Sequence, residues 1–166
     1  EEARVAVASG KAKNVILFVG DGMGVSTVTA ARIFDGQMQS KDGESNSLYM
    51  EKLPYLAMSK TYSVNQQTAD SAPTMTAMVT GVKTKESFLS TVSTIKKNDA
   101  AGCAEINRLG TLGELAEVAG LSTGVVSTAR ITHATPAAVY AHTPNRDAES
   151  DKDQNDLITA NALIGK

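Results

Sequence analysis

The chain has 166 residues, of which 42% are hydrophobic and 20% charged, and its formal net charge is −2. This length and composition indicate one globular domain with a hydrophobic core, and they exclude a disordered or collagen-like chain. The sequence contains no basic tract that would mark a nucleic-acid-binding protein and no apolar run long enough to cross a membrane.

The first predicted elements form the opening of an α/β unit. Residues 14–19 (NVILFV) are an unbroken apolar run, which is typical of a strand buried on both faces. A glycine-rich turn follows over residues 20–24, and apolar residues at helical spacing then predict a helix over residues 25–34. Strand, turn and helix in this order favour an α/β fold. A second strand is expected within residues 56–64.

A second helix is predicted to begin at Asp70 or Ser71 and to end at Gly81. Asp and Ser are common N-cap residues, a proline such as Pro73 is tolerated in a first turn, and glycine commonly ends a helix. Residues 83–110 are rich in Lys, Ser, Thr and Asn, which predicts a surface excursion.

The last third of the chain predicts further helices around one more strand. The expected elements are a helix over 112–119 ended by Gly120, a strand over 123–128 (TGVVST), a helix over 132–142, an acidic loop over 145–156 and a helix over 156–164. The sequence therefore predicts an α/β fold with a central, mainly parallel sheet, in which residues 14–19 and 123–128 are interior strands.

Asp21 is the first candidate site residue, because it lies where a predicted strand ends and open α/β sheets bind ligands at such ends. Gly20 and Gly22 beside it let the backbone approach a ligand closely. A carboxylate in this place needs a metal or another cation to offset its desolvation. A plain tight turn is the alternative, whereas a dinucleotide fingerprint is excluded because Val25 stands where glycine or alanine is required.

Ser71 is the second candidate, because a helix N-terminus offers oriented N–H groups and a positive dipole end to a phosphate or an ionised nucleophile. Taken alone, a serine in this position is more often an N-cap residue than a nucleophile. The GxSxG elbow of α/β-hydrolases is absent around Ser71. A nucleophilic Ser71 therefore requires activation by a metal.

The third candidate is a segment that holds both histidines of the chain, His133 and His142, together with Thr135 and Arg146. The planar guanidinium of an arginine binds two phosphate oxygens at once. Singly, each of these residues is more typical of a surface or helix-cap position.

Taken together, three segments resemble the alkaline phosphatase family. They are NVILFVGDGMG with Asp21, TADSAPTMTAMVTGVKT with Ser71, and STARITHATPAAVYAHTPNRD with Thr135 and Arg146. They occur in the family's order and at similar spacing over residues 13–147. The resemblance implies a periplasmic or secreted hydrolase, homodimeric when full length, that releases inorganic phosphate from phosphate monoesters through a phosphoserine intermediate. It also implies an alkaline-phosphatase-like three-layer sandwich with a central sheet.

The resemblance further implies a metal site of two zinc ions and one magnesium ion. Asp21 would bridge a zinc and the magnesium, and Ser71 would be a zinc ligand. Thr135 would give its hydroxyl oxygen to the magnesium. His133 stands where the family has Asp or His, and it would contact the magnesium through water at most.

The same resemblance implies the groups that handle the phosphate. Ser71 would be the nucleophile, and Arg146 would bind the phosphate with support from Asp70. Pro73 departs from the small residue usual two places after the nucleophile, and it offers no N–H to a phosphate.

Three metal ions need more ligands than this sequence offers, since zinc alone takes about four donors per ion. In the family the remaining aspartates, histidines and a glutamate come from the C-terminal half. We therefore expect residues 1–166 to be the N-terminal portion of a single alkaline phosphatase domain whose C-terminal half is absent, and to be inactive alone. The alternatives are a noncatalytic phosphate- or metal-binding fragment, and a superfamily relative acting on sulfate esters or phosphodiesters.

Overall fold

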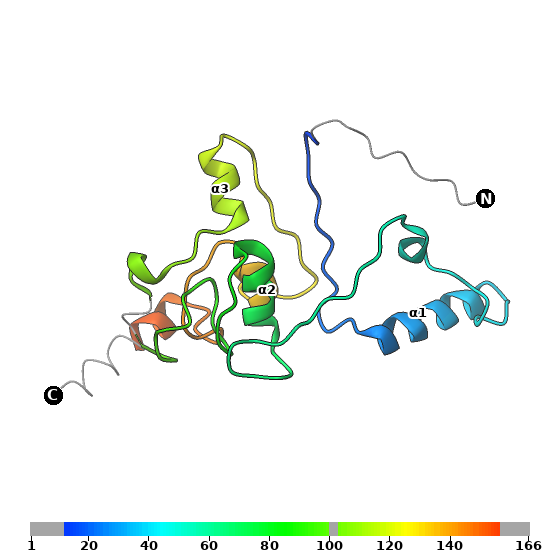
Figure 1. Ribbon diagram of the computed structural model, residues 1–166, viewed down its shortest axis with the longest axis horizontal. Helices are drawn as coiled ribbons and strands as arrows, with labels where there is room; N and C mark the ends of the chain where they lie inside the picture. The colour runs from blue at the N-terminus through cyan, green and yellow to red at the C-terminus, as the bar shows by residue number, and fades with distance from the viewer. Residues whose placement is uncertain (1–11, 100–102, 157–166) are drawn as a thin grey trace. The chain divides into compact units, whose positions relative to one another are not determined.

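The computed structural model describes residues 12–99 and 103–156, which belong to two units, residues 1–59 and 60–166. The elements in chain order are α1 (Val25–Met38), η1 (Tyr49–Lys52), α2 (Ser71–Thr80), η3 (Glu105–Asn107), α3 (Leu112–Val118) and α4 (Ala134–Ala137), as Figure 1 shows. None of the helices in the described ranges combines the length and the apolar character needed to span a membrane.

The described part of the first unit begins with an extended segment, a tight turn and α1, and it also contains η1. Gly22 has a φ of +64° in this turn, a conformation that L side chains rarely adopt. Glycine at position 22 therefore lets the chain pass directly from Asp21 into α1. The helix reaches Met38, beyond the end predicted near Phe34.

The predicted strand over residues 14–19 is not formed in this unit. The segment is irregular, and its side chains from Val15 to Phe18 are between 59% and 89% exposed. A segment that is apolar on both faces becomes an interior strand only when other strands pair with it and helices cover both faces. The described residues of the first unit supply neither, so the apolar run lies open.

The second unit differs from the predicted sheet in the same way. Residues 123–128 are irregular, Val126 is fully exposed, and Figure 1 shows the connection from α3 to α4 as a long extended path. No strand is formed over residues 56–64 either. Pairing within the described residues is limited to two isolated antiparallel bridges, Leu89 with Thr143 and Thr91 with Arg108.

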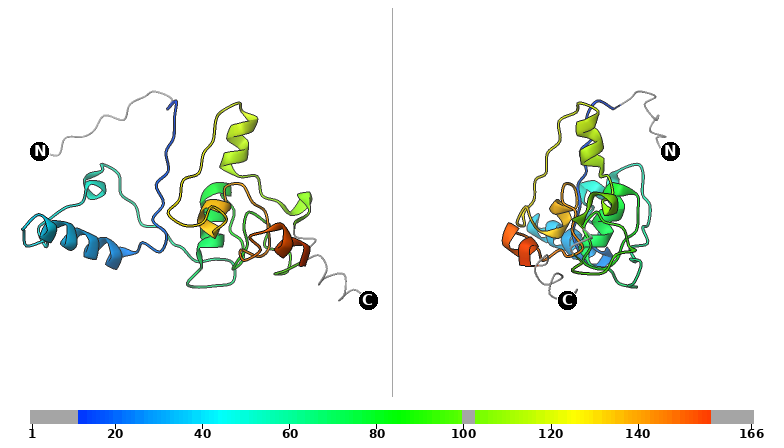
Figure 2. Two further views of the ribbon diagram at one scale, coloured as in Figure 1. Left: turned by 180° about the vertical axis from the view of Figure 1, so that it is seen from behind. Right: turned by 90° about the vertical axis from the view of Figure 1, so that its left-hand side faces the viewer.

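The core of the second unit lies around α2, which contacts both α3 and α4. Both views in Figure 2 show α2 and α4 side by side. The buried apolar side chains include four alanines, and the larger ones come from α2 and from the loop after it: Ala72, Met75, Val79, Phe88, Leu89, Ala134, Ala137 and Ala138. The scarcity of aromatic residues thus corresponds to a core in which helices pack closely.

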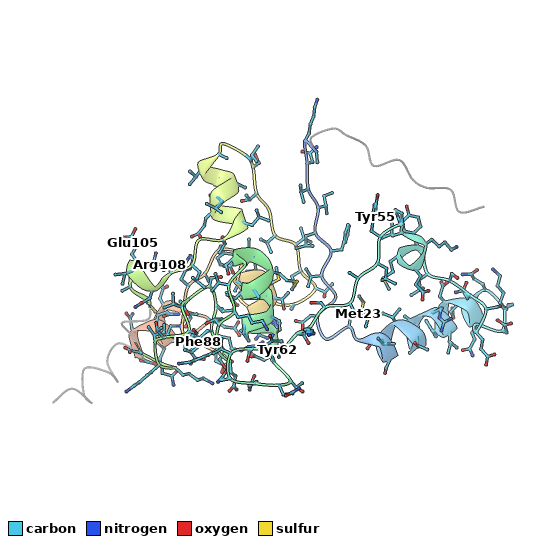
Figure 3. The ribbon with its side chains drawn as sticks, in the orientation of Figure 1. Met23, Tyr55, Tyr62, Phe88, Glu105 and Arg108 are labelled. Atoms are coloured by element: carbon cyan, nitrogen blue, oxygen red, sulfur yellow. The ribbon has the colours of Figure 1, made fainter. Side chains whose placement is uncertain are left out.

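The segment predicted to be a surface excursion, residues 83–110, is in part the centre of this core. Phe88 is 1% exposed and Leu89 is 2% exposed, while Ser90 and Thr91 are fully buried. Phe88, labelled in Figure 3, lies among the side chains of the second unit. The prediction was wrong because polar composition was taken as a sign of exposure, whereas several hydroxyl side chains of this segment are buried and some of them bond to neighbouring backbone. Ser90 Oγ, for example, donates to the Ala138 carbonyl at 2.6 Å.

The last predicted helices are also revised. The helix expected over residues 132–142 is the single turn α4, and residues 151–156 are helical where an acidic loop was expected. The helix predicted over residues 156–164 lies, apart from its first residue, outside the described residues. By contrast, α2 and α3 occur where predicted, and Gly81 and Gly120 beyond their ends have φ values of +74° and +77°.

Candidate active site

The candidate site is built on the N-terminus of α2, where Asp70 is the N-cap residue and Ser71 begins the helix. The Asp70 side chain makes no capping hydrogen bond to the helix, so its carboxylate is available for other partners. Pro73 is buried in the first turn, where backbone N–H groups have no partner within the helix in any case. The sequence therefore starts α2 at the pair of residues that carries the candidate chemistry.

Arg146 reaches this N-terminus from the segment that follows α4. Its Nη1 lies 2.9 Å from Ser71 Oγ and 3.0 Å from Asp70 Oδ2. The side chains of Arg146 and Asp70 are 19% and 25% exposed, so the ion pair is partly shielded from water. The contacts bring together three residues that the sequence singled out.

Donor and acceptor chemistry determines the direction of these hydrogen bonds. A guanidinium carries only donors, so Ser71 Oγ accepts from Arg146 and keeps its own hydrogen for another partner. The positive charge of the guanidinium next to Oγ, together with the N-terminal end of the α2 dipole, favours an anion at this position. The arrangement suits both an ionised serine oxygen and a bound phosphate oxygen.

His133, the N-cap residue of α4, lies on the other nitrogen of the same guanidinium. Its Nε2 is 3.1 Å from Arg146 Nη2. Since the guanidinium can only donate, Nε2 is the acceptor, and the neutral ring carries its hydrogen on Nδ1. Nδ1 is buried and has no hydrogen-bond partner among the described residues. His133 thus contacts Arg146 through Nε2 and keeps a buried Nδ1 without a partner in the described part of the chain.

Thr135 and Asp21 complete the set predicted from the sequence. Thr135 lies in α4, two residues after His133, and is half-buried in the same unit as Ser71. Asp21 is exposed in the turn before α1 and belongs to the first unit. The second unit therefore assembles Asp70, Ser71, His133 and Arg146 by direct contacts.

A bidentate ion pair joins the segment before α4 to the segment after Arg146. Arg130 Nη2 and Nε lie 2.6 Å and 3.0 Å from the two carboxylate oxygens of Glu149. Thr132 Oγ1 donates to the same carboxylate at 2.5 Å. These hydrogen bonds, with that from Arg130 first, lower the pKa of Glu149 to about 2. The ion pair therefore connects the segment just before His133 to the segment just after Arg146.

His142 belongs to a different set of contacts. Its Nε2 lies 2.8 Å from Glu114 Oε1, and its Nδ1 lies 2.8 Å from the Ser90 carbonyl oxygen. Glu114 also accepts from the Thr111 N–H and completes a capping box at the start of α3. His142 therefore links α3 to the core segment, and its side chain is 7% exposed rather than at the surface or helix-cap position that the sequence favoured.

Ser87 is a residue of the site that the sequence did not indicate. Its N–H donates to Asp70 Oδ1 at 3.3 Å, and its carbonyl oxygen accepts from the Arg146 N–H at 2.7 Å. Ser87 also has a φ of +66°, which is uncommon for a serine. It lies in the segment predicted to be a surface excursion, and no motif marks it.

The described residues offer few ligands for a metal cluster. They contain no group of three or more His, Cys, Asp or Glu side chains that could hold a metal ion. Among the site residues of the second unit, the buried Nδ1 of His133 has no hydrogen-bond partner within the described residues, and Ser71 Oγ accepts a hydrogen bond from Arg146. Residues 12–99 and 103–156 therefore do not by themselves fit two zinc ions and a magnesium ion.

Comparison with known proteins identifies the family. The alkaline phosphatase family model matches residues 12–164. An alkaline phosphatase from Gadus morhua is 48% identical over 143 residues, which cover 86% of this chain and 30% of that protein. The chain thus spans less than a third of the length of this relative.

Solved structures of alkaline phosphatases are also similar to this chain. A cold-active alkaline phosphatase from Shewanella sp. has a TM-score of 0.63 at 29% identity, covering 81% of this chain and 32% of that chain. A mutant alkaline phosphatase from the Antarctic bacterium TAB5, with Mg bound in the M3 site, has a TM-score of 0.62 at 26% identity, covering 84% of this chain and 34% of that chain. By sequence and by structure, the chain belongs to the alkaline phosphatase family.

Proposed function

We propose that the chain provides the nucleophile and the phosphate-binding arginine of a metal-dependent phosphomonoesterase. Ser71 attacks the phosphorus of a phosphate monoester, the ester oxygen leaves as an alcohol, and water then releases inorganic phosphate from the phosphoserine. The observation that carries the proposal is the contact of Arg146 Nη1 with both Ser71 Oγ and Asp70 Oδ2. Family membership supports it.

Each contact has a function in this scheme. Asp70 holds the Arg146 guanidinium by one nitrogen, next to the oxygen that becomes bonded to phosphorus. When a phosphate enters, the two Nη atoms bind its nonbridging oxygens in the bidentate way typical of arginine. The N–H groups at the start of α2 face the same charge, except at Pro73, which has none. Stabilisation of this charge is the main requirement of phosphoryl transfer.

The proposal assigns metal ligands to Asp21, Ser71 and Thr135, with His133 acting through water at most. Two zinc ions and one magnesium ion, when bound, would supply Lewis-acid activation of the serine oxygen. The TAB5 enzyme with Mg bound supports metal dependence in the family. Because the described residues hold no three-ligand group, we place the remaining ligands in a C-terminal portion of the same domain.

The same portion would supply the missing neighbours of the apolar segments. We propose that residues 14–19 and 123–128 become interior strands of a mainly parallel central sheet in the complete domain, because both are exposed here and apolar. A homodimer in the periplasm or outside the cell completes the proposal, and it rests on the resemblance to the family alone.

Two other functions remain testable. A noncatalytic fragment that binds phosphate or metal is favoured for the isolated chain by the scarcity of metal ligands. A relative that cleaves sulfate esters or phosphodiesters is disfavoured, because a serine nucleophile beside a bidentate arginine suits the dianion of a phosphate monoester.

The test is hydrolysis of para-nitrophenyl phosphate by the complete enzyme that contains this chain, with zinc and magnesium added. Ser71→Ala should lower kcat by more than about a thousandfold, because the covalent route is lost. Ser150→Ala is the matched control, since Ser150 is an exposed serine that lies directly before the helical residues 151–156. Equal activity of wild type and Ser71→Ala, or preference for a sulfate ester or a diester, would contradict the proposal.

A further inference from the structure

Lys97 contacts Ser87, the residue that hydrogen-bonds to both Asp70 and Arg146. Its Nζ donates to Ser87 Oγ at 3.0 Å, across ten positions of sequence. Ser87 is 5% exposed, whereas Lys97 is exposed apart from this contact. The contact therefore brings a cation from the surface to a buried hydroxyl beside the candidate site.

The loop is tied down on both sides of Lys97. Lys85 Nζ donates to the Ile95 carbonyl at 3.0 Å, and the Asn98 N–H donates to the Pro144 carbonyl at 3.4 Å. These hydrogen bonds fix the backbone before and after Lys97, so the path of the loop places the Lys97 side chain next to Ser87.

Ser87 closes a ring of contacts with the proposed phosphate-binding pair. Its N–H binds one oxygen of Asp70, the other oxygen of Asp70 binds the Arg146 guanidinium, and the Arg146 N–H returns to the Ser87 carbonyl. A shift of Ser87 would therefore move both the carboxylate and the backbone of Arg146. Only the hydroxyl of Ser87 is left for a contact outside this ring, and Lys97 occupies it.

We propose that Lys97 is a positioning residue for Arg146, acting through Ser87. The ammonium fixes Ser87 in its left-handed backbone conformation and adds positive charge beside the Asp70–Arg146 pair. Phosphate dianions therefore bind more tightly when Lys97 is docked on Ser87. The inference rests on the proposed function, because it gives Lys97 a part in phosphate binding.

The experiment uses the complete enzyme with zinc and magnesium, and it measures the Kd of inorganic phosphate by calorimetry alongside kcat and KM. Lys97→Met should raise the phosphate Kd and the KM about 2- to 5-fold, the range of one exposed charge contact, with kcat within about twofold. Lys97→Arg should restore the affinity, because it keeps a charged donor of similar reach. Lys96→Met is the matched control, since Lys96 is the adjacent exposed lysine.

Ser87→Ala tests the route. If Lys97 acts through Ser87, the single variants Ser87→Ala and Lys97→Met and their double variant should all have about the same phosphate Kd. A purely structural role would change the unfolding midpoint and leave the phosphate Kd unchanged, which would overturn the inference.

Three further outcomes distinguish this inference from the proposed function. If Lys97→Met and Lys96→Met changed the phosphate Kd equally, Lys97 would act only as a general surface charge, and the inference would be overturned. Additive effects of Ser87→Ala and Lys97→Met would overturn the route through Ser87. A wild-type enzyme that neither binds phosphate nor hydrolyses the ester would overturn the proposed function as well.

Discussion

Arg146 Nη1 lies 2.9 Å from Ser71 Oγ, although 75 positions separate the two residues in sequence. The contact depends on two local features, the start of α2 at Ser71 and the return of the chain after α4. It places the only permanently charged donor of the group on the proposed nucleophile.

Replacing the arginine should weaken phosphate binding more than it slows turnover. Arg146→Ala removes a charged hydrogen-bonding group, and a total loss of about 1.5–3 kcal/mol means that KM should rise about 10- to 150-fold while activity persists. Arg146→Lys should be intermediate, because an ammonium cannot bind two oxygens in one plane. Unchanged kinetics and unchanged inhibition by phosphate in the alanine variant would contradict this role.

Removing the carboxylate should act through the arginine. Asp70→Ala deletes the contacts to Arg146 Nη1 and to the Ser87 N–H, so the guanidinium loses its orientation and phosphate inhibition should weaken about 3- to 10-fold. Because Asp70 acts on Arg146, the Asp70→Ala/Arg146→Ala double variant should be no weaker than Arg146→Ala alone. Additive losses would show that Asp70 has a separate role.

Stability should depend on pH through Glu149. Its pKa is lowered to about 2 in the folded protein, chiefly by the hydrogen bond from Arg130. A lowered carboxyl pKa stabilises the fold above the unfolded value, about 4.3, and this stability is lost as the pH falls toward 2. Arg130 is 68% exposed, so screening by solvent makes this contribution to stability small.

The corresponding measurement is urea unfolding of wild type and Glu149→Gln between pH 7 and pH 2.5. The difference in unfolding free energy should be largest above pH 5 and shrink as the solution is acidified. Glu105→Gln, in the exposed η3 helix, is the control. A difference that does not change with pH would mean that the carboxylate charge contributes nothing.

The position of α2 and its candidate residues could be predicted from sequence, because the signals are local. Asp70 and Ser71 start the helix and Gly81 ends it, as capping preferences require. The grouping of Ser71 with Arg146 was predicted only through the resemblance to a family. Nothing in the spacing of a lone serine and a lone arginine indicates a contact.

Other features depend on partners distant in sequence. Leu89 is buried, and its backbone exchanges two hydrogen bonds with Thr143, a residue distant in sequence. The polar residues around Leu89 show no hydrophobic periodicity that would have predicted its burial. Ser87 has a positive φ, which composition would assign to glycine or asparagine. The apolar run over residues 14–19 indicates a strand that is covered on both faces. The strands and helices that would cover it must come from elsewhere in the fold.

The isolated 166-residue chain should be inactive. With zinc and magnesium added, its hydrolysis of para-nitrophenyl phosphate should not differ from that of its Ser71→Ala variant. The reason is the ligand count, since the described residues hold no group of three His, Cys, Asp or Glu side chains for a metal. A zinc-dependent rate that disappears on mutation of Ser71 would show that the chain holds a complete site.

The most direct test of the central claim, that Ser71 is the nucleophile, is to trap the phosphorylated enzyme. The complete enzyme is mixed with a labelled phosphate monoester, quenched in acid within one turnover and digested for peptide mapping. The expected result is one labelled peptide, phosphorylated at Ser71, and no label in Ser71→Ala. Label on another residue, or full turnover without any labelled peptide in wild type and in Ser71→Ala, would contradict the claim.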